Sequence, residues 1–140
     1  MVQQVLVVDD NEVVRWTLQA RLGVAGFEVT AVASAAEALK ALAAGRFDLV
    51  LLDHDMPEMT GLEALALIER RELCPRTPVV LLTSSEEFEL VRAARSGGAR
   101  GYLTKAEAFR NLMPALARLL GGRSDVTWID DFHTVSVAAR

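Results

Sequence analysis

Acidic side chains stand where two short apolar runs of the chain end. Asp9 and Asp10 directly follow the run VLVV, and Asp53 and Asp55 follow the run FDLVLL. Carboxylates that meet in one place repel one another unless a cation relieves them. Mg²⁺ prefers such hard oxygen ligands and takes one or two carboxylates from a protein. If Asp9, Asp10 and Asp53 converge, they predict a site for Mg²⁺.

Two further residues that follow apolar runs suit a phosphoryl group. Thr83 comes after VVLL and offers a hydroxyl donor, and Lys105 comes after GYLT and offers a positive charge. Both can donate hydrogen bonds to a phosphoryl group that is attached to a carboxylate. A metal ion would accept a phosphoryl oxygen as well. The set therefore predicts phosphoryl chemistry on an aspartate.

These residues become neighbours if strands and helices alternate along the chain. Short β-branched or leucine-rich runs recur five times, and a segment with helical apolar spacing follows each. The predicted strands span residues 5–8, 27–31, 47–52, 79–82 and 99–103. Right-handed crossovers then give an α/β fold with a doubly wound parallel sheet, whose ligand site lies at the carboxyl ends of the strands. We expect the acids, the threonine and the lysine to share that rim.

Local signals locate the ends of the helices. Ser34 and Glu37 predict a capping box at the start of the second helix. The fourth helix is expected over residues 86–96. Asn111 is the expected N-cap of the fifth helix, because Pro114 then lies in the first turn, where its missing N–H has no helical acceptor.

Composition excludes several classes of function. The 140 residues are 51% hydrophobic, which suits one compact domain with its own core. A net charge of −4 and a pI near 5.2 argue against a surface that neutralises nucleic-acid phosphates. Cys74 is the single cysteine, and no apolar run suits a signal sequence or a membrane span. We expect a soluble, cytoplasmic protein that binds neither DNA nor membrane.

Four motifs together resemble the receiver domain of two-component response regulators. They are VLVVDDNE, DLVLLDHDMPEMTG, PVVLLTSS and GYLTK, and the match runs from Val5 to about Leu120. Their order and their placement on the expected strands make the signal specific. The resemblance implies a flavodoxin-like domain over residues 1–122 with five parallel strands in the order 2-1-3-4-5. Residues 123–140 would form a C-terminal tail.

The resemblance implies a phosphoacceptor and a metal site. Asp53 would take a phosphoryl group from a phosphohistidine of a sensor histidine kinase or a phosphotransfer protein. Asp9 and Asp10 would hold Mg²⁺ together with Asp53 and the backbone carbonyl of Asp55. Such a domain is regulatory and not an enzyme, since it promotes only its own phosphotransfer and autodephosphorylation.

The resemblance also implies how the signal leaves the domain. In the family, the hydroxyl that matches Thr83 turns towards the phosphoryl group, the aromatic side chain that matches Tyr102 swings inward, and the lysine that matches Lys105 pairs with the phosphate. The face made by the fourth helix, the fifth strand and the fifth helix then contacts a downstream protein. A phosphorylation-linked homodimer through the same face is a further hypothesis.

Two departures from the family pattern bear on these expectations. Ala106 follows Lys105 where many receivers have proline, and a cis bond without proline costs about 3 kcal/mol, so we expect a trans bond and a different loop. Asp55 adds a carboxylate two residues beyond the acceptor, where it could repel incoming phosphodonors or orient a water.

Several side chains allow more than one interpretation. Trp16 lies off the apolar stripe of the first helix, which fits either an exposed kinase-docking position or packing against a neighbouring helix. His54 and His133 lack a second histidine nearby in sequence and are expected to be solvated. The apolar tail residues favour a short strand or a contact with a neighbour: Val126, Trp128 and Ile129. Three arginines fit either a patch that binds a partner or plain solvation: Arg92, Arg95 and Arg100.

Two other functions stay open. The segment LVLLDHD also fits the Asp-x-Asp motif of haloacid dehalogenase-type phosphohydrolases, with Asp53 as nucleophile and Asp55 as acid/base. The adjacent acids at 9 and 10 and the lack of room for a cap domain argue against it. A pseudo-receiver would keep the fold and bind a partner without phosphate, although the intact acids, threonine and lysine argue against that. The chain is expected to be either a stand-alone regulator or a fragment of a longer protein.

Overall fold

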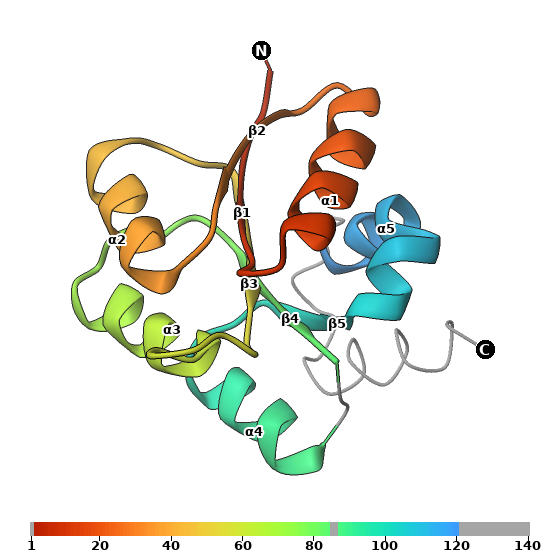
Figure 1. The fold of residues 1–140 in the computed structure, drawn as a ribbon. Coiled ribbons are helices and arrows are strands. Elements are labelled where there is room, and N and C mark those ends of the chain that lie inside the picture. The colour runs from red at the N-terminus through yellow and green to blue at the C-terminus, as the bar shows by residue number, and fades with distance from the viewer. Residues whose placement is uncertain (1, 85–86, 121–140) are drawn as a thin grey trace.

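The chain folds as five β-α units in sequence order. The computed structural model describes residues 2–84 and 87–120 (Figure 1). The strands are β1 (Gln4–Val8), β2 (Glu28–Val32), β3 (Leu49–Asp53), β4 (Val79–Thr83) and β5 (Gly101–Thr104). The helices are α1 (Glu12–Val24), α2 (Ala35–Ala44), α3 (Gly61–Arg70), α4 (Phe88–Ser96) and α5 (Lys105–Leu120). The predicted alternation is confirmed, and the ends of the strands shift by one or two residues at most.

Parts of the expected organisation fall on residues that are not described. The expected start of α4 at residue 86 and the tail at 123–140, with its apolar residues and His133, lie outside the described residues. The division into a domain and a tail therefore stays a prediction. Within the described ranges, no helix combines the length and the apolar character that crossing a membrane requires.

All five strands run parallel in the order β2-β1-β3-β4-β5, as predicted. Helices α1 and α5 cover one face of the sheet, and α2, α3 and α4 cover the other (Figure 1). Every residue of β3 and β4 is buried, because helices exclude water from both faces of these central strands. The chain leaves β1 in opposite directions to reach β2 and β3, so the carboxyl ends of β1 and β3 form the switch point where ligands bind in such sheets.

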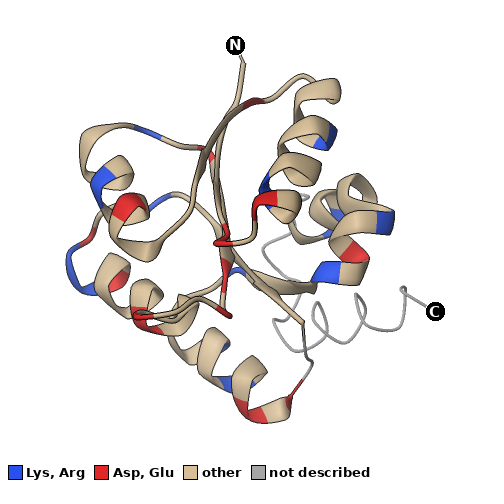
Figure 2. Ribbon diagram, viewed as in Figure 1, with Lys and Arg blue, Asp and Glu red and all other residues tan. Residues whose placement is uncertain are grey.

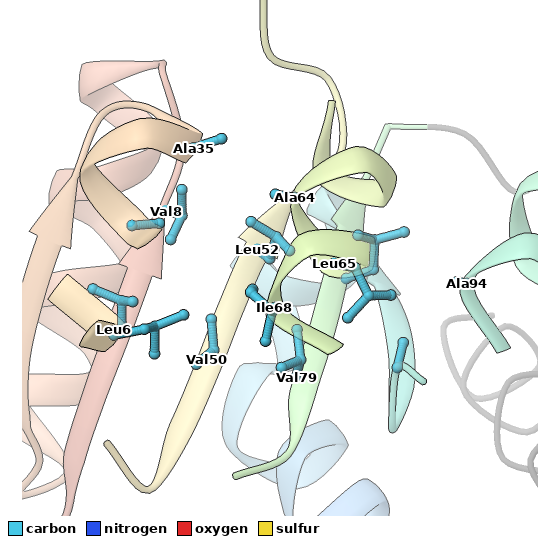
Figure 3. Packing of buried hydrophobic residues seen from close by; sticks show 14 of the residues in the cluster. Leu6, Val8, Ala35, Val50, Leu52, Ala64, Leu65, Ile68, Val79 and Ala94 are labelled. Carbon is cyan, nitrogen blue, oxygen red and sulfur yellow. The ribbon is translucent and has the colours of Figure 1, made fainter. Parts of the chain in front are cut away.

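Alternating side chains of the strands feed two separate cores. Leu6 and Val8 of β1 and Val50 and Leu52 of β3 pack under α2, α3 and α4 (Figure 3). Their sequence neighbours on the same strands point to the opposite face, where α1 and α5 cover them. Each fully buried leucine or valine stabilises the fold by about 1.5–3 kcal/mol. This packing on both faces holds the strand ends in fixed positions.

The cap of α2 differs in part from the prediction, and α3 has a capping box that was not predicted. The Ser34 hydroxyl oxygen accepts from the N–H of Glu37 at 3.2 Å, as expected, but the Glu37 carboxylate accepts from the Ser34 hydroxyl at 3.1 Å. The predicted capping box at α2 is therefore one-sided. The reciprocal box lies at α3, where Thr60 and Glu63 each accept from the other's backbone N–H at 3.2 and 2.9 Å.

The predicted helix start at Asn111 is confirmed only in part. The helix begins at Lys105, and the Thr104 hydroxyl caps it by accepting from the N–H of Glu107 at 3.1 Å. Asn111 nevertheless interrupts the helix, with φ −146° and ψ 38°. Pro114 lies three residues after this break, so its missing N–H still costs no helical hydrogen bond.

Candidate functional site

The carboxyl ends of four adjacent strands carry the residues that the sequence singled out. Asp9 directly follows β1, Asp53 ends β3, Thr83 ends β4, and Lys105 directly follows β5. Acidic positions lie at the ends of β1 and β3, and a basic position lies at the start of α5 (Figure 2). Three of these side chains are almost fully buried: Asp9, Asp53 and Thr83. The sheet thus brings the predicted acids, threonine and lysine to one rim.

Three carboxylates converge at this rim. Asp9, Asp10 and Asp53 each offer an oxygen atom, and these atoms lie within 4.8 Å of one another. Asp10 is exposed, whereas Oδ2 of Asp53 is buried and has no hydrogen-bond partner among the described residues. Mg²⁺ keeps several of its waters when it binds a protein, so an open side next to buried carboxylates suits it. The donor set therefore fits a hydrated, hard divalent cation.

Lys105 reaches both buried acids. Its Nζ lies 3.2 Å from Oδ2 of Asp9 and 3.2 Å from Oδ1 of Asp53. Both contacts are ion pairs between buried carboxylates and a partly exposed ammonium group. Burial lowers the pKa of Lys105, but the negative charges of Asp53 and Asp9 outweigh that effect and raise the pKa. Lys105 therefore stays charged and bridges the two carboxylates.

Asp53 is a destabilised carboxylate. Burial raises its pKa to about 6, with a further contribution from the charge of Asp9. The backbone N–H of Asp55, which donates to Oδ1 of Asp53 at 3.0 Å, and the charge of Lys105 act in the opposite direction. At neutral pH the carboxylate is mostly ionised, which a nucleophile requires, and it gains from any cation or hydrogen-bond donor brought near it.

Backbone contacts fix the position of Asp9. The N–H of Asn11 donates to Oδ1 of Asp9 at 2.9 Å, and Asn11 also caps α1 by accepting from the N–H of Val14 at 3.1 Å. The guanidinium of Arg15 donates to the carbonyl of Asp9 at 2.7 Å. Neither Asn11 nor Arg15 was a predicted site residue. An N-cap residue directly after an acidic pair was the available signal for Asn11.

Close packing of α3 fixes the main chain at Asp53. The N–H of Gly61, the first residue of α3, donates to the carbonyl of His54 at 3.1 Å. A Cβ at Gly61 would lie 2.5 Å from the carbonyl oxygen of Asp53 and 2.7 Å from Cα of His54. A residue without Cβ is needed for this approach. Gly61 was part of a predicted motif, but its contact with the main chain of Asp53 was not predicted.

The switch residues lie inside the protein. Tyr102 of β5 is 4% exposed and belongs to the core under α2, α3 and α4. Thr83 is 1% exposed and lies opposite Thr104 in the pairing of β4 with β5. Movement of either residue stays a prediction.

Asp55 does not join the three carboxylates. Its side chain is exposed, and its Oδ2 accepts from the Ser84 hydroxyl at 2.9 Å and from the Ser84 N–H at 3.3 Å. The expected role of the Asp55 backbone carbonyl as a metal ligand stays a prediction. Ser84 was not a predicted site residue, because nothing in the spacing of the two loops reveals this contact.

The structure decides between some of the alternative interpretations. The Trp16 side chain is 64% exposed, so it does not pack against a neighbouring helix of the described chain. His54 is half-buried, and its Nδ1 is buried without a described hydrogen-bond partner, so the expected full solvation was wrong. No cis peptide bond occurs among the described residues, as expected at Ala106. The guanidinium of Arg92 lies 5.5 Å from the ring centroid of Phe88 and therefore has a partner on its own helix.

Comparisons with known proteins agree with these observations. The family model of the response regulator receiver domain matches residues 5–117. The sensory/regulatory protein RpfC of Xanthomonas campestris pv. campestris is 36% identical over 118 residues, which cover 83% of this chain and only 16% of RpfC. The solved chemotaxis protein CheY4 of Vibrio cholerae superposes with a TM-score of 0.80 at 32% identity, over 85% of this chain and 99% of CheY4. A response regulator from Burkholderia pseudomallei, solved with a phosphorylated aspartic acid, gives a TM-score of 0.74 at 30% identity, over 82% of this chain and 65% of that protein.

Proposed function

Because the chain belongs to the family of response regulator receiver domains, we propose that it is a phosphorylation-dependent switch in which Asp53 accepts the phosphoryl group. The observation that carries the proposal is the environment of Asp53, a buried carboxylate between an acidic pair and a lysine. Its Oδ2 lacks a described hydrogen-bond partner and is the available nucleophilic oxygen. The related protein with a phosphorylated aspartic acid supports this assignment.

The transfer forms one bond and breaks one. The ionised oxygen of Asp53 attacks the phosphorus of a phosphohistidine on a histidine kinase or a phosphotransfer protein. A P–O bond to Asp53 forms as the P–N bond breaks, and the histidine nitrogen keeps the electron pair and takes a proton from solvent. The product is an aspartyl phosphate, and later attack by water returns the free carboxylate and inorganic phosphate.

Asp9, Asp10 and Asp53 are the side chains that would hold Mg²⁺, with the backbone carbonyl of Asp55 as the ligand carried over from the family. Bound there, the ion would offset the charge of the carboxylates and of the phosphoryl oxygens. The protein's own part is to keep these carboxylates close together and in fixed positions, which Asn11 and Arg15 do for Asp9.

A phosphoryl group on Asp53 would change the partners of Lys105 and Thr83. It adds about two negative charges and three acceptor oxygens. The ammonium now 3.2 Å from both Asp9 and Asp53 would then gain a stronger anionic partner, and the Thr83 hydroxyl lies at the end of the adjacent strand. New hydrogen bonds at the ends of β4 and β5 would bias the position of α4, which follows β4 directly. The face formed by α4, β5 and α5 would carry the signal to a downstream protein or to a second copy of the chain.

The kinase would dock near α1. The exposed Trp16 and Val13 lie on this helix, which starts three residues after Asp9 at the rim. The function is regulatory, and a cytoplasmic location remains part of the proposal. We expect no direct contact with nucleic acid by this chain.

Uptake of phosphate by the resting protein tests this function. The full chain is incubated with Mg²⁺ and acetyl phosphate, and the intact mass is recorded beside that of Asp53→Asn. The proposal expects a phosphoryl adduct on the wild type and none on the variant. Absence of an adduct on a folded, Mg²⁺-binding wild type would favour the pseudo-receiver. Steady turnover of generic phosphate esters would favour the phosphohydrolase.

A further inference from the structure

Asp55 contacts two loops of the site at once. Its backbone N–H donates to Oδ1 of Asp53 at 3.0 Å. Its side-chain Oδ2 accepts from the Ser84 hydroxyl at 2.9 Å and from the Ser84 N–H at 3.3 Å. The main chain of Asp55 therefore contacts the phosphoacceptor, while its side chain contacts Ser84 directly after β4. We call the contact between Asp55 and Ser84 the clasp.

The clasp occupies two donors at the mouth of the site. Ser84 directly follows Thr83 at the end of β4, and β4 pairs with β3 so that Asp53 lies opposite Leu82. The N–H and hydroxyl of Ser84 thus lie one residue beyond the hydroxyl that is proposed to meet the phosphoryl group. Phosphoryl oxygens form strong charge-assisted hydrogen bonds with donors of this kind. The carboxylate of Asp55 and a phosphoryl group on Asp53 would compete for the same donors.

We propose that Asp55 is a positioning residue whose clasp on Ser84 stabilises the unphosphorylated form and must open when Asp53 carries a phosphoryl group. This inference rests on the proposed function. It differs from the two roles that the sequence suggested for Asp55, because repulsion of phosphodonors and orientation of a water need no contact with Ser84. The clasp makes phosphoryl binding weaker and links it to release of Ser84 next to the end of β4.

Affinity for beryllofluoride, a mimic of the phosphoryl group, measures the competition. Calorimetric titration in Mg²⁺ compares the full-length wild type with Asp55→Ala, Asp55→Asn, Ser84→Ala and the double alanine variant. Asp55→Ala removes the acceptor, so we expect binding to tighten about three- to tenfold, the range that a solvent-exposed, charge-assisted hydrogen-bond pair supplies. Asp55→Asn keeps an oxygen acceptor for Ser84. The logarithm of its dissociation constant for beryllofluoride should therefore lie at least halfway back from the Asp55→Ala value to the wild-type value.

Ser84→Ala tests the other half of the clasp. It removes the hydroxyl donor from the clasp and from the phosphoryl mimic alike, so we expect binding to change less than about twofold by itself, and the tightening caused by Asp55→Ala to be smaller in this background than in the wild type. Glu28→Ala, which removes an exposed acid at the start of β2, is the matched control and should leave the affinity unchanged. In the protein without beryllofluoride, the backbone amide resonance of Ser84 should move in Asp55→Ala and not in Glu28→Ala.

The outcomes separate this inference from the proposed function. Equal tightening by Asp55→Ala and Asp55→Asn, with the effect of Asp55→Ala undiminished in the Ser84→Ala background, would show charge repulsion alone and overturn the clasp. Unchanged affinity in every Asp55 and Ser84 variant would overturn it as well. A wild type that binds Mg²⁺ but not beryllofluoride would overturn the proposed function, and the clasp with it.

Discussion

Asp53 and Lys105 show how single residues prepare the site. Burial of the Asp53 carboxylate beside the buried Asp9 has an electrostatic cost. Lys105 offsets part of this cost because its ammonium group forms ion pairs with both acids. The electrostatic cost that remains favours binding of a divalent cation and reaction with a phosphoryl donor, because each gives the carboxylates new favourable partners. Two measurements at the residue scale follow from this balance.

The first prediction concerns Asp53→Asn and pH. Asp53 has a folded pKa raised from 3.8 to about 6, so the folded protein binds more protons than the unfolded chain between these values. The stability from this group is therefore fully present below pH 3.8 and is lost as pH rises through about 6. Without metal, the asparagine variant should be more stable than the wild type by about 1–3 kcal/mol at pH 7.5, with a smaller difference at pH 5. Urea unfolding at both pH values measures this, and a difference that grows towards pH 5 would contradict it.

The second prediction concerns Lys105→Met, which keeps an apolar stem but removes the charge. Asp9 and Asp53 then repel each other without relief, so we expect a loss of about 1–3 kcal/mol at pH 7.5 in the absence of metal. Mg²⁺ should stabilise this variant more than the wild type, because it replaces the missing cation. Thermal unfolding with and without Mg²⁺ checks both statements. Lys40→Met, at an exposed lysine of α2, is the control, and equal Mg²⁺ effects in all three proteins would refute the explanation.

At the scale of elements, α3 depends on a single position. Its first residue approaches the main chain of Asp53 so closely that an added Cβ would meet backbone atoms at 2.5 and 2.7 Å. Backbone cannot move aside as a side chain can. The contact therefore links the packing of α3 to the geometry of the phosphoacceptor.

Gly61→Ala should destabilise the protein by about 1–3 kcal/mol and weaken Mg²⁺ binding, because the main chain at Asp53 must shift. Gly23→Ala is the matched control, since a Cβ at Gly23 in α1 meets nothing within 4 Å. It should stabilise the protein by about 0.5–1 kcal/mol through its higher helix propensity. Chemical denaturation of both variants decides the matter, and similar effects of the two substitutions would disprove the proposed contact.

The elements show what sequence could and could not predict. Apolar runs located all five strands, and the order of the strands then placed Asp9, Asp53 and Lys105 on one rim, because parallel strands share their carboxyl edge. The turns of α5 before Asn111 were missed because they bury Glu107 and Ala108, which do not form an apolar stripe. Contacts of Gly61 and of Ser84 were missed because they depend on how two loops approach in space.

At the scale of the whole molecule, two cores on either side of one sheet hold the rim, where the side chains of Asp10 and Asp55 are exposed. The chain spans 16% of the length of RpfC, so a receiver of this kind also occurs as one part of a longer protein. Whether the chain acts by itself or as part of a longer protein, the proposed function depends on transfer of a phosphoryl group to Asp53. The changes proposed for α4, β5 and α5 follow from that transfer.

Intact-mass measurement after incubation with acetyl phosphate and Mg²⁺ tests that event most directly. We expect one phosphoryl adduct per chain, which does not form when Mg²⁺ is removed with a chelator before the donor is added, and which never forms on Asp53→Asn. An adduct that persists on Asp53→Asn, or a folded wild type that binds Mg²⁺ and takes up no phosphoryl group, would contradict it.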